Sequence, residues 1–139
     1  MKMKRKAIVY WVTTIFVTLI LGISGFMALT HAAPMMKALA HLGYPAYFSN
    51  ILGIGKIVGL IVFLAPGLPR LKEWAYAGFT ITILSACYSH FSSGDGFLAL
   101  ELLVTFTALM ASYITRPSGR TLSPSSDRIG DINNAIAVR

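Results

Sequence analysis

Charged residues and cysteine are scarce in this sequence. Of its 139 residues, 12% are charged and 55% are hydrophobic, and the mean hydropathy is +0.68. So little polar surface cannot cover a water-soluble domain of this length, which favours the lipid bilayer as the solvent. The single cysteine, Cys87, lies in an apolar run. An internal disulfide, a CxxC redox centre and a cysteine-built zinc site are therefore excluded.

Acidic residues are also few, since 5 Asp and Glu stand against 12 Lys and Arg and leave a net charge of +7. A basic balance of this size can indicate nucleic-acid binding, but here the basic residues sit in short segments beside apolar runs and form no single face. The positive-inside rule of membrane proteins produces this placement. We expect the lipid bilayer as a partner, and no nucleic acid.

Four apolar runs predict membrane-spanning helices, at about residues 7–30, 51–65, 74–91 and 97–115. About 20 helical residues, rising ~1.5 Å each, cross a hydrocarbon core of ~30 Å. The first run follows a basic stretch and imitates a secretory signal, but it is longer than the ~7–15 residues of a signal core, so we expect an uncleaved helix. The predicted fold is an all-α membrane four-helix bundle.

A short interfacial helix is predicted at about residues 34–42, between the first two spans. Pro34 suits a first helical position, Gly43 suits a C-terminal cap, and Pro45 stops continuation. Lys37 and His41 share one side of this helix, which places it at the outer interface or folded back over the bundle. We expect residues 1–116 to form one transmembrane domain and residues 117–139, rich in small polar residues, to form a flexible cytoplasmic tail.

Basic residues also predict the orientation. Four crossings place the N-terminus, the loop at 70–73 and the flank with Arg116 and Arg120 on one side, with only Lys37 opposite. We therefore expect a multi-pass protein of the bacterial plasma (inner) membrane with both termini in the cytoplasm.

Small residues recur along every predicted span, as expected where helices pack closely in lipid. They are Thr14, Thr18, Gly22 and Gly25 in the first, Gly55 and Gly59 in the second, Gly78, Thr82, Ser85 and Ser89 in the third, and Thr105, Ala108 and Ser112 in the fourth. Packing of a four-helix bundle explains them without a ligand.

Two charged residues lie inside the predicted spans at similar depth in the outer leaflet, Lys56 and Glu101. An isolated charge in hydrocarbon is costly, by about 2.5–3.5 kcal/mol for a basic residue at the centre of the bilayer. We therefore predict an inward-facing ion pair between the two. The alternative is that Lys56 snorkels outward and that Glu101 lies close enough to the interface to be hydrated.

Other polar residues fall at the same depth and predict an outer-leaflet polar pocket around this pair. They are Ser24, His41, Tyr88, His90 and Asp95. Such a pocket could bind a polar headgroup or move a proton, although interfacial solvation also explains each histidine alone. The histidines lack the tight spacing of metal ligands, so no metal is predicted. The inner half is expected to be plain packing.

Several motifs resemble the DoxX-like family of small four-helix integral membrane proteins. They are LGYPAY at 42–47, LGIGKIVG at 52–59, LKEWAYAGF at 71–79, and Ser-His at 89–90 followed by GDG at 94–96. The resemblance covers about residues 8–114. It implies a membrane fold and a link to a subunit of quinone-linked thiosulfate oxidation, with no agreed catalytic residues to carry over.

The leading functional hypothesis is an accessory or small-molecule-binding protein whose pocket takes a quinone- or lipid-like ligand. One alternative is a membrane enzyme in which Glu101 or His90 acts as general acid or base and Lys56 stabilises negative charge. Another is a small proton-coupled transporter. No haem, iron–sulfur or flavin motif is evident, so no cofactor is named, while a membrane redox partner or a second copy of the chain remains open as a partner.

Overall fold

The computed structural model describes residues 2–122 and 136. In these residues the chain is all-α and has no strand, which confirms the predicted class. The helices are α1 (Lys2–Leu29), α2 (Ala33–His41), α3 (Phe48–Leu64), α4 (Pro69–Ser92) and α5 (Gly96–Ile114), followed by the 3-10 turn η1 (Ser118–Arg120). Most of the tail predicted at 117–139 lies outside the described residues.

Helix bounds follow the predicted runs, with the largest differences at the starts of helices. The loop expected at 70–73 is the first turn of α4, because Pro69 occupies an initial helical position that needs no N–H donor. Helix α1 already begins in the basic stretch, and α3 begins three residues before the expected residue 51. The short helix α2 lies within one residue of its predicted bounds.

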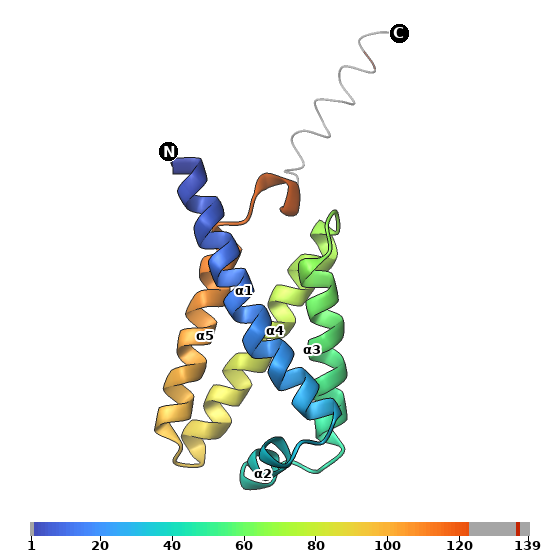
Figure 1. The fold of residues 1–139 in the computed structure, drawn as a ribbon, viewed down its shortest axis with the longest axis vertical. Coiled ribbons are helices and arrows are strands. Elements are labelled where there is room, and N and C mark those ends of the chain that lie inside the picture. Colours follow the sequence, from blue (N-terminus) through green and yellow to red (C-terminus); the bar gives the residue numbers. More distant parts are fainter. Residues whose placement is uncertain (1, 123–135, 137–139) are drawn as a thin grey trace.

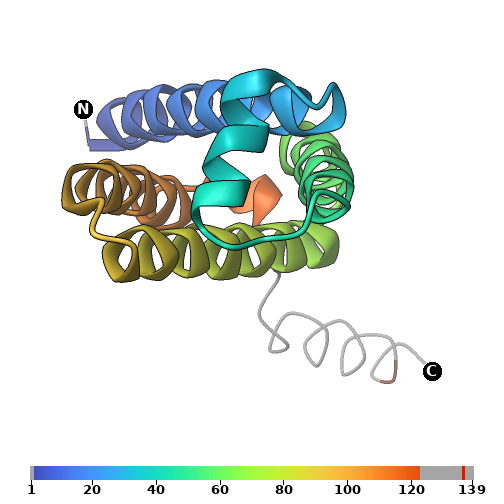
Figure 2. The same cartoon turned by 90° about the horizontal axis from the view of Figure 1, so that it is seen from below.

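Helices α1, α3, α4 and α5 form a ring in which each contacts two neighbours (Figures 1 and 2). Helix α1 packs against α3 and α5, and α4 packs against the same two from the other side, so α3 and α5 stand diagonally. The N-terminus and the end of α5 share one end of the ring, here termed the terminal end. Helix α2 crosses the other, the α2 end, beside the α4–α5 turn (Figure 2).

The core is a cluster of buried side chains to which all four ring helices contribute. Its members are Val17, Leu21, Leu60, Phe63, Ala75, Tyr76, Phe79, Ile83 and Leu109. Glycine permits a close contact between α1 and α3, since a Cβ on Gly53 of α3 would lie 2.7 Å from the Leu29 side chain of α1. The α1–α3 contact therefore requires glycine at this position.

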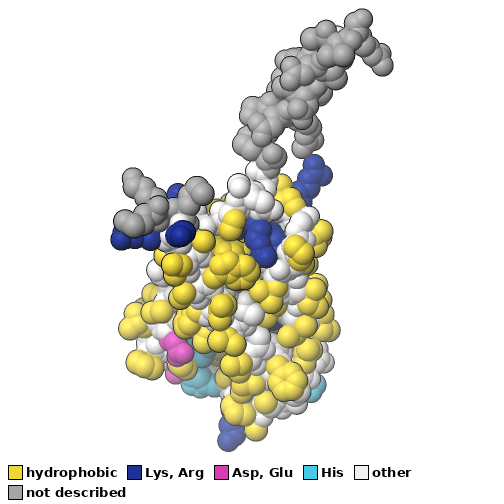
Figure 3. All heavy atoms as spheres, turned by 45° about the horizontal axis from the view of Figure 1, so that its top comes forward, with side chains coloured by type: hydrophobic (Ala, Val, Ile, Leu, Met, Phe, Trp, Pro, Cys, Tyr) yellow, Lys and Arg dark blue, Asp and Glu magenta, His cyan; other side chains and the backbone are white. Residues whose placement is uncertain are grey.

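The outside of the ring is apolar, as Figure 3 shows over the flank in view. Two segments, Lys4–Leu29 and Gly96–Ile114, are long and apolar enough to cross a membrane, yet only 28% and 22% of their most apolar windows are buried. The core helix of a soluble protein would be mostly buried, so this exposure indicates a membrane protein. Helix α3 is apolar but shorter, at 17 residues, and α4 carries charged residues in its first turns.

Candidate functional site

A cavity of about 370 Å³ lies at the α2 end, between α2 and the adjoining halves of α3 and α4. Helix α2 covers it with Met35, Ala38 and Leu39, followed by Leu42 at the C-cap, and most of the remaining wall is apolar. Polar groups project from several elements, namely Ser24, Tyr44, Lys56, Thr82, Ser85 and His90. A mostly apolar hollow with a few convergent polar groups is the usual form of a small-molecule site.

Lys56 is the charged group in the cavity wall. Its Nζ donates a hydrogen bond to the Ser24 Oγ at 2.6 Å, and its Cβ packs 3.0 Å from the position that a Cβ on Gly25 would take. An ammonium carries three donors, so this single bond leaves two unused. Lys56 has no ion-pair partner among the residues that the structure describes.

The predicted ion pair between Lys56 and Glu101 is wrong. Glu101 is exposed on α5, does not line the cavity, and forms no side-chain hydrogen bond within the described chain. The reason lies in the ring order: α3 and α5 are diagonal and their backbones do not approach closely, whereas Ser24 comes from α1, a direct neighbour of α3. Similar distance from the α2 end did not place the two residues on the same side of the bundle.

Asp95 joins two histidines at the edge of the cavity. Its Oδ2 accepts hydrogen bonds from the Nε2 of His41 at 2.9 Å and from the Nδ1 of His90 at 3.0 Å. Asp95 lies in the α4–α5 turn, so the bonds connect the end of α2 to the end of α4. The bond from His90, followed by the charge and the bond of His41, holds the pKa of the Asp95 carboxyl below its ordinary value of 3.8.

A second bond links the cavity rim to α4, since the hydroxyls of Tyr44 and Ser89 are hydrogen-bonded at 2.7 Å. Tyr88, by contrast, was predicted to line the pocket, but it does not. It is 73% exposed and borders a separate shallow hollow between α4 and α5. At 3.6 residues per turn, residues two apart point to opposite sides of a helix, so His90 faces the cavity and Tyr88 faces outward.

Comparison with protein families agrees with the resemblance seen in the motifs. The model of the DoxX-like family matches residues 12–113. The chain belongs to the DoxX-like family. No curated protein and no solved structure matches it. The matched stretch of this DoxX-like protein contains every residue that lines the cavity.

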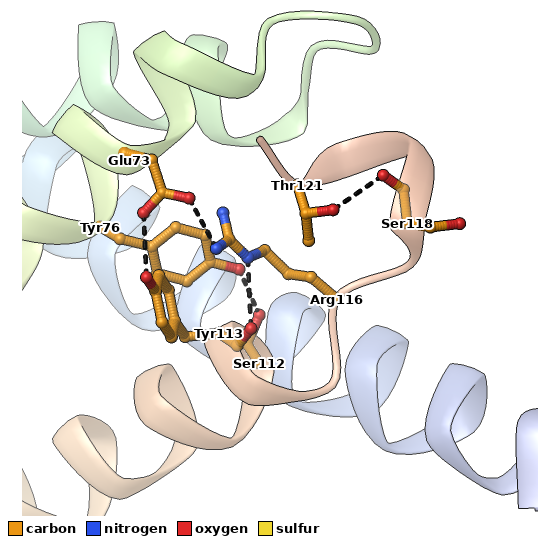
Figure 4. Close-up of polar contacts among 7 residues, drawn as sticks. All are labelled: Glu73, Tyr76, Ser112, Tyr113, Arg116, Ser118 and Thr121. Atoms are coloured by element: carbon orange, nitrogen blue, oxygen red, sulfur yellow. Dashed lines mark hydrogen bonds and ion pairs between the residues drawn. The ribbon is translucent and has the colours of Figure 1, made fainter. Parts of the chain in front are cut away.

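The DoxX-like chain has a second polar region, at the terminal end (Figure 4). The Ser112 Oγ is hydrogen-bonded to the Tyr76 hydroxyl and to the Thr14 Oγ1, each at 2.8 Å, and so joins three helices. Beside it, the Arg116 Nη2 donates to the Glu73 Oε1 at 2.7 Å. The Arg116 guanidinium also lies over the Tyr76 ring, 4.8 Å from its centroid.

Lys72 and Arg120 extend this region. Lys72 is 1% exposed, and its Nζ donates to the carbonyls of Val62 at 3.0 Å and Phe63 at 2.8 Å. These carbonyls belong to the last turn of α3, where no helical donors follow. Arg120 donates from Nη1 to the Tyr10 hydroxyl at 3.0 Å and thereby fastens η1 to α1.

The expectation that this half would be plain packing is therefore wrong. Thr14 and Ser112 were identified as small packing residues, and both are buried, but they form a hydrogen-bonded network rather than a plain small-residue contact. The available signal was Tyr76, whose hydroxyl needs a partner when it is buried within a span. Lys72 also carried a signal, because a lysine shortly after a proline-broken helix end can reach the free carbonyls.

Proposed function

We propose that this DoxX-like protein crosses the bacterial inner membrane four times, through α1, α3, α4 and α5, with the terminal end in the cytoplasm. Exposed apolar side chains cover all four helices. Basic side chains gather towards the terminal end (Figure 3), whereas Lys37 lies on α2 at the opposite end. Alternating helices with cationic ends on one side follow the positive-inside rule.

Accessibility labelling tests this topology. In a chain with Cys87→Ser, we expect a cysteine introduced at Ser118 to react with an impermeant maleimide only after the cells are opened. A cysteine introduced at Ser93, in the α4–α5 turn, should react in intact cells. Reaction of both from the same side would refute the four-span topology.

We further propose that the protein binds a small amphipathic molecule, quinone- or lipid-like, in the cavity at the α2 end. The observation that carries this proposal is the position of Lys56. Its ammonium faces a largely apolar hollow with one hydrogen bond made and two donors unused. A polar ligand head at Lys56 would satisfy those donors, and the apolar wall would hold the rest of the ligand.

The terminal end favours binding over transport. A transporter needs a route from the cavity to the other side of the membrane, but there the Tyr76–Ser112–Thr14 bonds and the buried Lys72 fill the interior of the ring. A binding or accessory role requires only a cavity that is closed at one end. The arrangement thus supports a bound molecule that enters and leaves at the α2 end.

Acid–base catalysis is a second candidate, with His90 in place of Glu101. The Nδ1 of His90 donates to Asp95, which fixes the tautomer and leaves Nε2 as the basic nitrogen, and His90 lines the cavity. Under this candidate, His90→Gln abolishes conversion of a bound substrate while leaving its retention unchanged. Loss of retention in that variant would instead assign His90 to binding.

Native mass spectrometry of the protein released from nanodiscs tests the binding role. We expect the wild-type chain to retain a low-mass amphiphile, and Ala86→Phe, which fills the cavity from α4, to reduce the retained fraction at least tenfold. Ala77→Phe is the matched control, because Ala77 is an exposed residue of the same helix outside the cavity. Equal retention by both variants, or no retained molecule in the wild type, would exclude the cavity as the site.

Lys56→Met tests the polar anchor, with Ile54→Met as its control on the outward face of α3. We expect the first to reduce retention and the second to leave it unchanged. If both variants retain the same amount, Lys56 does not hold the ligand head.

A further inference from the structure

A second hollow, of about 440 Å³, runs along the outside of the seam between α3 and α4. The two helices form the sparsest of the four contacts in the ring. The hollow is here termed the seam groove, and it shares wall residues with the cavity at the α2 end. The shared residues are Phe48, Leu52, Lys56 and Thr82. The two spaces therefore adjoin along these four residues, and Lys56 borders both.

Two glycines keep the seam groove open. A Cβ built on Gly55 of α3 or on Gly78 of α4 meets no atom within 4 Å, although both residues line the groove. Gly59, one turn beyond Gly55, differs, because its Cβ would lie 2.8 Å from the Phe79 ring. Close packing therefore accounts for Gly59, but it does not account for Gly55 and Gly78. These two create free space on a lipid-facing surface.

The seam groove has the length and the lining of an alkyl-chain site. On α3 it extends from Phe48 to Val62, which is about 21 Å at ~1.5 Å per residue. Its wall is almost wholly apolar, apart from Thr82 and the side chain of Lys56. The Thr82 hydroxyl is engaged with the Gly78 carbonyl of its own helix. The lining thus offers two groups with polar donors for a ligand, the Trp74 indole N–H and the Lys56 ammonium, and only Lys56 is charged.

The charge of Lys56 indicates which polar head a ligand would carry where the cavity and the seam groove adjoin. The Lys56 ammonium lies between two apolar spaces, and the described residues supply no carboxylate within ion-pair distance of it. Asp95, in the α4–α5 turn, is engaged by His41 and His90 instead. An anionic head would both neutralise the ammonium and accept its two unused hydrogen bonds.

We infer that the ligand is a single-chain amphiphile with an anionic head, which binds Lys56 from within the cavity while its chain leaves through the seam groove. This inference rests on the proposed binding function and specifies its ligand. A carboxylate and a phosphate monoester share the required chemistry. The seam groove would also be the route by which such a molecule exchanges with the bilayer without passing through water.

Tryptophan quenching offers a direct test, because Trp74 lines the seam groove and the chain has only two tryptophans. In the detergent-solubilised chain with Trp11→Phe, stearic acid brominated at mid-chain should quench Trp74 saturably. The methyl ester of the same acid should require at least a tenfold higher concentration. Unlabelled stearate and stearyl phosphate as competitors distinguish the two anionic heads, and failure of both to compete would overturn the inference.

Gly78→Leu places a side chain in the seam groove, where nothing lies within 4 Å of the new Cβ, and should abolish the saturable quenching; a thermal melt checks that the variant is folded. Ala77→Leu is its control on the adjacent exposed position. Quenching that survives Gly78→Leu, or that the ester produces equally well, overturns the inference. If Ala86→Phe still loses the retained amphiphile, the proposed binding function stands although the inference about the ligand fails. If retention is insensitive to Ala86→Phe as well, both proposals fail.

Discussion

Replacing Lys72 with Met should strongly destabilise the fold, although Lys72 lies far from the cavity. Its Nζ donates to the carbonyls of Val62 and Phe63 at the end of α3. Pro66 lacks an N–H, so the Val62 carbonyl has no donor four residues ahead even if the helix continued. Methionine keeps the length of the lysine side chain up to Cε and removes the Nζ that forms both hydrogen bonds.

The expected loss follows from the two bonds and from the cost of burying the charge. Each hydrogen bond from a charged donor contributes about 1.5–3 kcal/mol net, and a cation at a helix C-terminus adds about 0.3–1 kcal/mol. These net values already include desolvation of the donor, and because the two bonds share one buried ammonium, whose desolvation costs several kcal/mol, their sum is an upper bound. We therefore expect the free energy of unfolding to fall by about 2–4 kcal/mol.

Unfolding of the detergent-solubilised chain, followed by far-UV circular dichroism, measures this difference. Arg70→Met is the matched control, because Arg70 lies in the same turn of α4, is exposed, and forms no ion pair within the described residues. A loss below about 0.5 kcal/mol, typical of neutral surface substitutions, would show that solvent replaces Lys72 at these carbonyls. The assigned role of Lys72 would then be wrong.

Three further predictions concern other contacts. Tyr76→Phe and Ser112→Ala should be non-additive in a double-mutant cycle of unfolding free energies, by about 0.5–3 kcal/mol, because the two hydroxyls bond directly; additive losses would contradict the bond. Gly53→Ala should cost about 1–3 kcal/mol by overpacking, whereas Gly55→Ala should be neutral or stabilising in the same thermal melts. Because the pKa of Asp95 is lowered on folding, its stabilising effect is present above the ordinary carboxyl pKa and disappears as the pH falls through the folded value. Wild type and Asp95→Asn should therefore differ in melting temperature at neutral pH and converge in acid.

Periodicity and breakers were sufficient to predict the helices, since apolar runs and proline-containing breaks have strong local signatures. The short α2 was predicted from Pro34, Gly43 and Pro45, and its bounds agree within one residue. The predicted start of α4 was wrong, because the charged residues after Pro69 were interpreted as a loop. Proline and charged residues are both compatible with the first turn of a helix at an interface.

The sequence predicted how far along each helix the candidate-site residues lie, but not which neighbouring helix each side chain faces. Ser24, Lys56 and His90 line the cavity as expected, whereas Glu101 and Tyr88 face away from it. Residue number determines how far along a helix a side chain lies, but only the order of helices around the ring determines which neighbour it meets. Without that order, the diagonal placement of α3 and α5 could not be known.

The two polar regions use similar residue types with opposite consequences. At the terminal end, buried hydroxyls, Lys72 and Arg116 bond across helices, so separating the helices would expose several unpaired polar groups at once. At the α2 end, the bonds of His41 and Tyr44 lie at the rim and a cavity lies beneath them. Water can replace the exposed bond between His41 and Asp95 at little cost, because exposed ion pairs contribute only about 0–1 kcal/mol. Separating the helices therefore costs less free energy at the α2 end. At this same end, Lys56 has two unused hydrogen-bond donors.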